Sequence, residues 1–187
     1  MKLKSIIVSL LISIILFSCK NEDKNNSSLP DNNGSVEKPL LDKSIFTVTL
    51  NAIVQKDDSF QLYYKYNDNE PFDEKKSLFI EFKGSQQPQD IVFRLPKDEI
   101  PNFLRLDFGT NKNQDKIEIK SFKMNYLDKK VEIKGTDFFN YFYPNPLTEK
   151  TDAKLGTLTP IISKDGGYDP MVASAEGLSK QIQTIIK

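Results

Sequence analysis

From residue 44 onward, hydrophobic and polar residues alternate with a period of two in one short segment after another. Such alternation places successive side chains on opposite faces of a β-strand. Polar turns such as Asp57-Asp58-Ser59 separate the segments. The pattern predicts an all-β, antiparallel sandwich or barrel, and we expect a jelly-roll-like sandwich. The expected strands fall in the segments 45–55, 60–66, 78–82, 91–95, 104–108, 117–126 and 131–133.

The segment 117–126 changes the face on which its apolar residues lie. Ile117 and Ile119 have one parity, whereas Phe122 and Met124 have the other. A strand cannot move its buried side chains to the other face without an extra residue or a change of sheet. We therefore expect a β-bulge or a sheet change near residues 120–121.

The last fifty residues have a less regular pattern. The aromatic segment 138–143 suits either a helical turn or a strand. Residues 155–162 predict an edge strand, because Pro160 lacks an amide donor for a sheet ladder. A short amphipathic helix is expected from about Ala175, with Ser174 as its candidate N-cap. Its apolar residues have helical spacing and are Leu178, Ile182, Ile185 and Ile186. Between two prolines, residues 97–100 predict one helical turn.

The N-terminus has the parts of a secretory signal. Lys2 and Lys4 form a short positive region, and residues 6–17 are apolar apart from two serines. This run is too short to span a bilayer as a helix, which needs about 20 residues. We expect residues 1–18 to be a signal peptide.

The segment Leu16-Phe17-Ser18-Cys19 resembles the lipobox of bacterial lipoproteins. The resemblance implies that Cys19 carries diacylglycerol, begins the mature chain and anchors it to a membrane. The alternative is an ordinary cleaved signal with a chance cysteine. The charged stretch 20–24 resembles the surface-export signal of lipoproteins in the Bacteroidota, although it also suits the start of a solvated linker. The first reading implies the outer membrane, with either a periplasmic or a cell-surface location.

Composition divides the rest of the chain in two. Residues 19–43 are polar and contain two prolines, which predicts a lipidated N-terminus and a flexible tether. Residues 44–187 contain enough apolar side chains for one sandwich domain with a C-terminal extension. Without the two signal lysines, 24 basic and 26 acidic residues remain, a balance that argues against a nucleic-acid partner.

The chain has no histidine and a single cysteine. This excludes Ser-His-Asp and Cys-His catalysis, as well as zinc bound by histidine or by several thiolates. No phosphate-binding glycine loop is present. We therefore expect no cofactor, no metal and no catalytic residue. The acidic loops 68–70 and 111–115 contain oxygen ligands of the kind that Ca²⁺ prefers, but they lack EF-hand spacing and suit solvated turns.

Two consecutive strand segments carry a resemblance. Residues 103–109 read Phe-Leu-Arg-Leu-Asp-Phe-Gly, and residues 116–124 follow as Lys-Ile-Glu-Ile-Lys-Ser-Phe-Lys-Met. Together they resemble the β-sandwich modules appended to bacterial cell-surface glycan glycosyltransferases. The strand pattern is also similar to that of galactose-binding-like jelly-roll modules. The resemblance covers roughly residues 45–134, has Phe108 where the family pattern has proline, and implies fold more than function.

Five residues are candidate ligand contacts. Arg105 and Asp107 share a strand face and suit a ligand groove, an exposed ion pair or a partly buried pair that fixes the strand end. Tyr63 is off the core parity of its strand, so we expect it to be exposed. Tyr141 and Tyr143 flank a phenylalanine near the end of the domain. An aromatic ring can support the apolar face of a sugar, and ordinary rim packing is the alternative for all three tyrosines.

These features favour a membrane-anchored exported lipoprotein with a non-catalytic, ligand-binding β-sandwich, and a glycan is the expected ligand. The alternative is an outer-membrane interaction or assembly protein that recognises a protein partner, for instance by strand pairing. A third reading is a carboxylate-dependent glycosidase, which would need two acids roughly 5–10 Å apart in a cleft.

Overall fold

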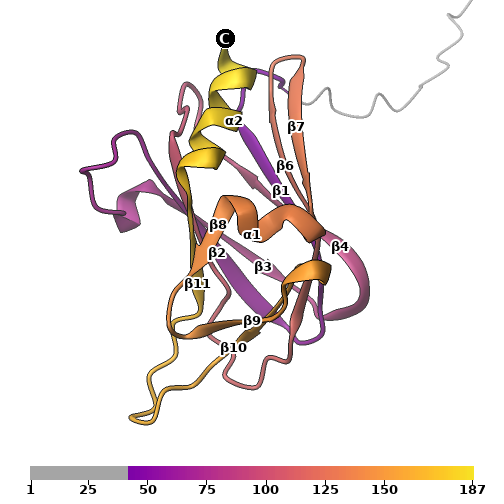
Figure 1. The fold of residues 1–187 in the computed structure, drawn as a ribbon. Helices are drawn as coiled ribbons and strands as arrows, with labels where there is room; N and C mark the ends of the chain where they lie inside the picture. Colours follow the sequence, from indigo (N-terminus) through magenta and orange to yellow (C-terminus); the bar gives the residue numbers. More distant parts are fainter. Residues whose placement is uncertain (1–41) are drawn as a thin grey trace, which may run out of the picture. The chain divides into compact units, whose positions relative to one another are not determined.

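The computed structural model describes residues 42–187, which form two antiparallel β-sheets and a short C-terminal helix (Figure 1). This architecture confirms the predicted all-β sandwich. The expected signal peptide, Cys19 and nearly all of the expected tether lie outside the described residues. Within residues 42–187, no helix combines the length and the apolar character that crossing a bilayer requires.

The larger sheet has six strands. In spatial order, five of them are β4 (Ser85–Arg94), β1 (Thr47–Val54), β6 (Ile117–Tyr126), β10 (Thr157–Pro160) and β9 (Thr148–Asp152). The sixth, β7 (Lys129–Lys134), forms a hairpin with the second half of β6. The smaller sheet has the order β3 (Ser77–Phe82), β2 (Asp58–Lys65), β5 (Phe103–Asp107), β11 (Met171–Ser174) and β8 (Phe142–Pro144). All neighbouring strands in both sheets are antiparallel.

The alternating apolar residues predicted to face inward do form the core. On β1 and just before it, Phe46 and every second residue up to Val54 are at most 1 % exposed. Phe60 of β2 packs edge-on against Phe82 and Phe108, with ring centroids 4.7 and 5.3 Å apart. Burying side chains of this size contributes about 1.5–3 kcal/mol each. The period of two along the chain is therefore the direct cause of the sandwich.

The predicted change of face in β6 is confirmed as a β-bulge. Asn51 of β1 pairs with Ser121, and the next residue, Ala52, pairs with Ile119. Lys120 is thus the extra residue, and it has no partner on β1. Because of this insertion, both Ile119 and Phe122 point into the core and are fully buried.

Three local expectations are corrected. Strand β10 is an inner strand rather than an edge, because the polar strand β9 covers its free side; Pro160 stands at the end of that ladder, opposite Thr148. Residues 97–100 form a turn with Asp98 at φ 66° instead of a helical turn. Ser174 is not a helix cap, since it belongs to β11 and its hydroxyl accepts a hydrogen bond from the Leu104 amide (3.0 Å).

The aromatic segment forms both of the elements considered for it. A single helical turn, α1 (Phe138–Tyr141), leads directly into β8. The C-terminal helix α2 (Glu176–Ile186) starts where expected and buries Leu178, Ile182 and Ile185. It packs against β6 and β7 of one sheet and β11 of the other, so it covers the gap between the two sheets beside these strands (Figure 1). The short 3-10 turns are η1 (Glu74–Lys76), η2 (Gly135–Asp137) and η3 (Ala153–Leu155).

Candidate ligand-binding site

The outer face of the five-stranded sheet carries a continuous row of side chains. Ser77, Tyr63, Arg105, Ala173 and Tyr143 are successive cross-strand partners on β3, β2, β5, β11 and β8. Direct cross-strand partners project from the same face. The row therefore brings three of the five candidate residues onto one surface.

A second row runs beside the first. It consists of Phe79, Gln61, Asp107 and Met171 on β3, β2, β5 and β11. Asp107 joins the candidates of the first row, since it lies two residues from Arg105 on the same strand face. Neighbouring strands are about 4.8 Å apart, so the patch from Phe79 to Tyr143 is about 19 Å wide.

Arg105 is held on three sides. Its Nε and one terminal nitrogen donate hydrogen bonds of 2.7 and 2.6 Å to the two carboxylate oxygens of Asp107. Its guanidinium carbon lies 4.8 Å from the centre of the Tyr63 ring, a cation–π distance. Asp169 lies 3.7 Å away on the loop before β11. The Arg105 and Asp107 side chains are 22 % and 14 % exposed, so this is the partly buried pair among the three arrangements considered from the sequence.

Tyr63 is on the expected face, but the prediction that it is exposed is wrong. Only 6 % of the residue is accessible. The loop from β2 to β3 folds over it, with the Phe72 ring edge-on at 6.4 Å and Glu74 accepting a 2.6 Å hydrogen bond from the phenol. The same Glu74 accepts a 2.9 Å bond from Gln61. The tyrosine is therefore the floor of the patch and not part of its surface.

Lys65 explains why this loop stays in place. Its ammonium donates to the backbone carbonyls of Asp68 and Glu70 at 2.7 and 2.8 Å. It also lies 5.0 and 5.1 Å from the ring centres of Phe72 and Phe103. Hydrogen bonds from a charged donor are stronger than neutral ones, which fixes the loop over Tyr63.

Burial and hydrogen bonding set the ionisation of the floor. Burial, helped by the bond to Glu74, raises the pKa of Tyr63 to about 12. The hydrogen bonds from Tyr63 and Gln61 lower the pKa of Glu74. Near neutral pH, Tyr63 is thus a protonated donor and Glu74 a charged acceptor. Desolvation raises the pKa of Asp107, against the opposing effect of Arg105.

Above this floor is a hollow of about 290 Å³. Its lining includes Gln61, Tyr63, Arg105, Asp107, Asp169 and Phe79. Phe79 is 59 % exposed at the rim, and Tyr143 is 57 % exposed farther along the Arg105 row. Exposed rings of this size on a rigid sheet are available to pack against a ligand.

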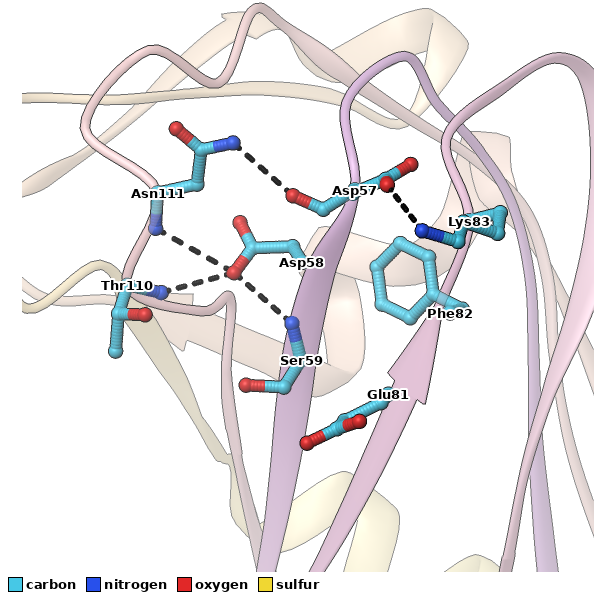
Figure 2. Close-up of a pocket in the computed structure, with 8 residues that line it drawn as sticks. All are labelled: Asp57, Asp58, Ser59, Glu81, Phe82, Lys83, Thr110 and Asn111. Atoms are coloured by element: carbon cyan, nitrogen blue, oxygen red, sulfur yellow. Dashed lines mark hydrogen bonds and ion pairs between the residues drawn. The ribbon is translucent and has the colours of Figure 1, made fainter.

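A larger hollow of about 640 Å³ lies between the start of β2, the end of β3 and the loop after β5 (Figure 2). Two of its three carboxylates, those of Asp57 and Asp58, are already paired. Oδ1 of Asp58 accepts bonds from the amides of Ser59, Thr110 and Asn111, and Oδ2 accepts one from Gln114. Figure 2 also shows Asp57 paired with Lys83, at 2.7 Å. We regard this hollow as a loop junction that stabilises the fold.

Tyr141 is not part of the patch. It lies in α1 and lines a separate hollow beside β7 and α2, together with Val131 and Gln181. Its ring packs close to Gly177 at the start of α2. This position is ordinary packing between two helices.

Several residues of the patch were missed from the sequence. Phe79 could have been found, because it is an aromatic residue off the Leu78/Ile80 core parity of its strand. Glu74 and Asp169 come from loops, and no sequence pattern places them beside Arg105. No three His, Cys, Asp or Glu side chains are grouped to hold a metal ion anywhere in the described part of the chain.

Fold and site together define an all-β sandwich with a polar hollow and exposed aromatic rings on one outer sheet face. Comparison with protein-family models, curated proteins and solved structures gives no match for this chain.

Proposed function

We propose that this protein is a membrane-anchored exported lipoprotein whose sandwich binds glycans without catalysis on the outer face of the five-stranded sheet. The observation that carries the proposal is the combination of Phe79 and Tyr143, both more than half exposed, with a fixed polar hollow between β3 and β11. A sugar offers an apolar face to such rings and hydroxyl groups to the polar side chains.

The floor supports binding because it is already organised. Glu74 accepts hydrogen bonds of 2.6 and 2.9 Å from Tyr63 and Gln61, and Asp107 accepts two of 2.7 and 2.6 Å from Arg105. A site that needs no ordering loses less free energy on binding. The rows lie on strands, which hold side chains more rigidly than loops do.

The first prediction concerns the two exposed rings. Purified protein is expected to bind a subset of a diverse glycan array, and calorimetry should then show that Phe79→Ala and Tyr143→Ala each weaken binding roughly five- to tenfold. That range corresponds to about 1–1.4 kcal/mol, the contribution expected of one stacked ring.

Leu155→Ala is the matched control, because Leu155 is 61 % exposed and lies in η3, which contacts the other sheet. It should bind like the wild type. A folded protein that binds no glycan on the array would contradict the proposal, as would equal affinities in all three variants.

The membrane anchor has its own test. Cells that express the wild-type chain are expected to incorporate radioactive palmitate into the protein, because Cys19 is the single thiol and the proposed site of acylation. Cys19→Ser should remove the label and release the protein from the membrane fraction. Unlabelled wild-type protein that fractionates with the cytosol would refute the anchor and the export together.

A further inference from the structure

The lining of the hollow above Tyr63 is negatively charged. It contains the carboxylates Glu74, Asp107 and Asp169, and Arg105 is its one cation among the described residues. Its formal charge is therefore −2. The Arg105 and Asp107 side chains are 22 % and 14 % exposed, so their charges are screened less than on an open surface, whereas Asp169 is 60 % exposed.

Asp107 already offsets the charge of Arg105. Two of the three guanidinium nitrogens are bonded to Asp107, and the guanidinium carbon lies 4.8 Å from the centre of the Tyr63 ring. A carboxylate or sulfate group on a ligand would be attracted by the Arg105 guanidinium, which is already bonded to Asp107. The same group would be repelled by the three carboxylates of the lining. Repulsion exceeds attraction for any acidic ligand in this position.

Asp169 differs from the other two carboxylates. Glu74 accepts two hydrogen bonds and Asp107 accepts two from Arg105. The Asp169 carboxylate accepts no hydrogen bond from any residue between 42 and 187, and its side chain is 60 % exposed at the mouth of the hollow. It is the group that a ligand can reach at the smallest desolvation cost.

The Phe79 ring gives an independent indication of the same ligand chemistry. It lines the same hollow from β3 and is 59 % exposed. The face of an aromatic ring attracts a cation as well as the C–H face of a sugar. The Phe79 ring on the β3 side of the hollow and the Asp169 carboxylate on the β11 side, which has only the 3.7 Å contact with Arg105, thus suit a ligand with an apolar face and a positive charge.

We infer that the site prefers sugars that carry a free amine over their neutral and acidic counterparts, with the ammonium group bound by Asp169 and the apolar sugar face packed on Phe79 across the hollow. The inference rests on the proposed glycan binding and names the class of glycan. Asp169 then sets specificity, whereas Arg105, Tyr63 and Glu74 position the surface beneath it.

The test uses three oligosaccharides of equal length: chitosan, its fully N-acetylated form, and oligogalacturonate. Calorimetry is done at roughly pH 6, below the pKa of an aliphatic amine. We expect the amine form to bind about fivefold more tightly than the acetylated form, and the acidic form to give no measurable binding. Added salt should weaken the amine form selectively, because it screens the ion pair.

Two variants with the same loss of charge locate the effect. Asp169→Asn should reduce the preference for the amine form about three- to fivefold, the size expected for a rim ion pair, and leave the affinity for the acetylated form within about twofold. Asp115→Asn is the control, since Asp115 is exposed and forms no ion pair with the residues described. It should keep the full preference.

The outcomes separate the two proposals. A folded protein that binds glycans on the array but none of these three sugars would contradict this inference alone, and absence of binding on the array as well would contradict both proposals. Binding in which the acetylated or acidic form is at least as tight as the amine form would overturn the inference alone. An unchanged preference in Asp169→Asn would also overturn it.

Discussion

Deletion of Lys120 is expected to unfold the domain. Lys120 is the extra residue of the bulge in β6, and without it the second half of the strand would turn over relative to β1. Phe122 and Met124 would then point to solvent, and Lys123 would point into the core. Losing the burial of two such side chains costs about 3–6 kcal/mol before the buried lysine is counted. This is close to the whole stability of a typical domain, about 5–15 kcal/mol.

Slippage of the strand cannot rescue the deletion. If the second half keeps its register, the first half must turn over, and the fully buried Ile117 and Ile119 become exposed instead. The matched control is Lys120→Ala, which keeps the extra residue and removes only a half-exposed ion pair with Glu118. We expect that substitution to change the free energy of unfolding by less than about 1 kcal/mol. Urea unfolding followed by circular dichroism measures both, and a deletion variant that still unfolds cooperatively near the wild-type midpoint would contradict the role of the bulge.

The bulge was predictable because it leaves a local trace. Ile119 and Phe122 are three residues apart and both apolar, which a regular strand with one buried face does not allow. The main strands of both sheets were predictable for the same reason. They alternate over all or part of their length, β4 only from Ile91, so the sequence alone indicates which side chains face the core.

Strands without alternation could not be found in this way. Strand β9 reads Thr-Glu-Lys-Thr-Asp and is almost wholly exposed apart from Thr148, so only its partner β10 makes it a strand. Strand β11 reads Met-Val-Ala-Ser and lies between β5 and β8, which supply its hydrogen bonds. In both cases the tertiary partner, and not the residues themselves, determines the conformation.

The candidate site was likewise predictable where it depends on residue spacing within one strand, and not where it depends on tertiary contacts. That Arg105 and Asp107 share a face follows from their spacing, and the structure confirms it. The burial of Tyr63 does not follow from its strand, because it depends on the loop that Lys65 fixes from the far end of β2. The neighbours Glu74 and Asp169 are distant in sequence from Arg105 and come together with it only in the folded sandwich.

Gly109→Ala is expected to destabilise the domain by about 3–5 kcal/mol. Gly109 has φ +83°, a backbone conformation that costs an L-residue about 1–2 kcal/mol. A methyl group there would also overlap the carboxylate of Asp58. That side chain is short and is held by the amides of Thr110 and Asn111, so it can move only by breaking charge-assisted hydrogen bonds.

Gly166→Ala separates the two contributions. Gly166 has a nearly identical φ of +86°, but nothing lies within 4 Å of the methyl group that the substitution adds. It should therefore lose only the backbone part, about 1–2 kcal/mol. In the Asp58→Ala background the overlapping carboxylate is gone, so Gly109→Ala should lower the free energy of unfolding no more than Gly166→Ala does. A double-mutant cycle of Asp58→Ala and Gly109→Ala, measured by urea unfolding, gives this coupling directly. Equal losses of unfolding free energy for the two glycine substitutions in the wild-type background would contradict this explanation. They would show that the surroundings of Asp58 (Figure 2) tolerate the methyl group, and that the close approach of Asp58 is not the reason for a glycine at position 109.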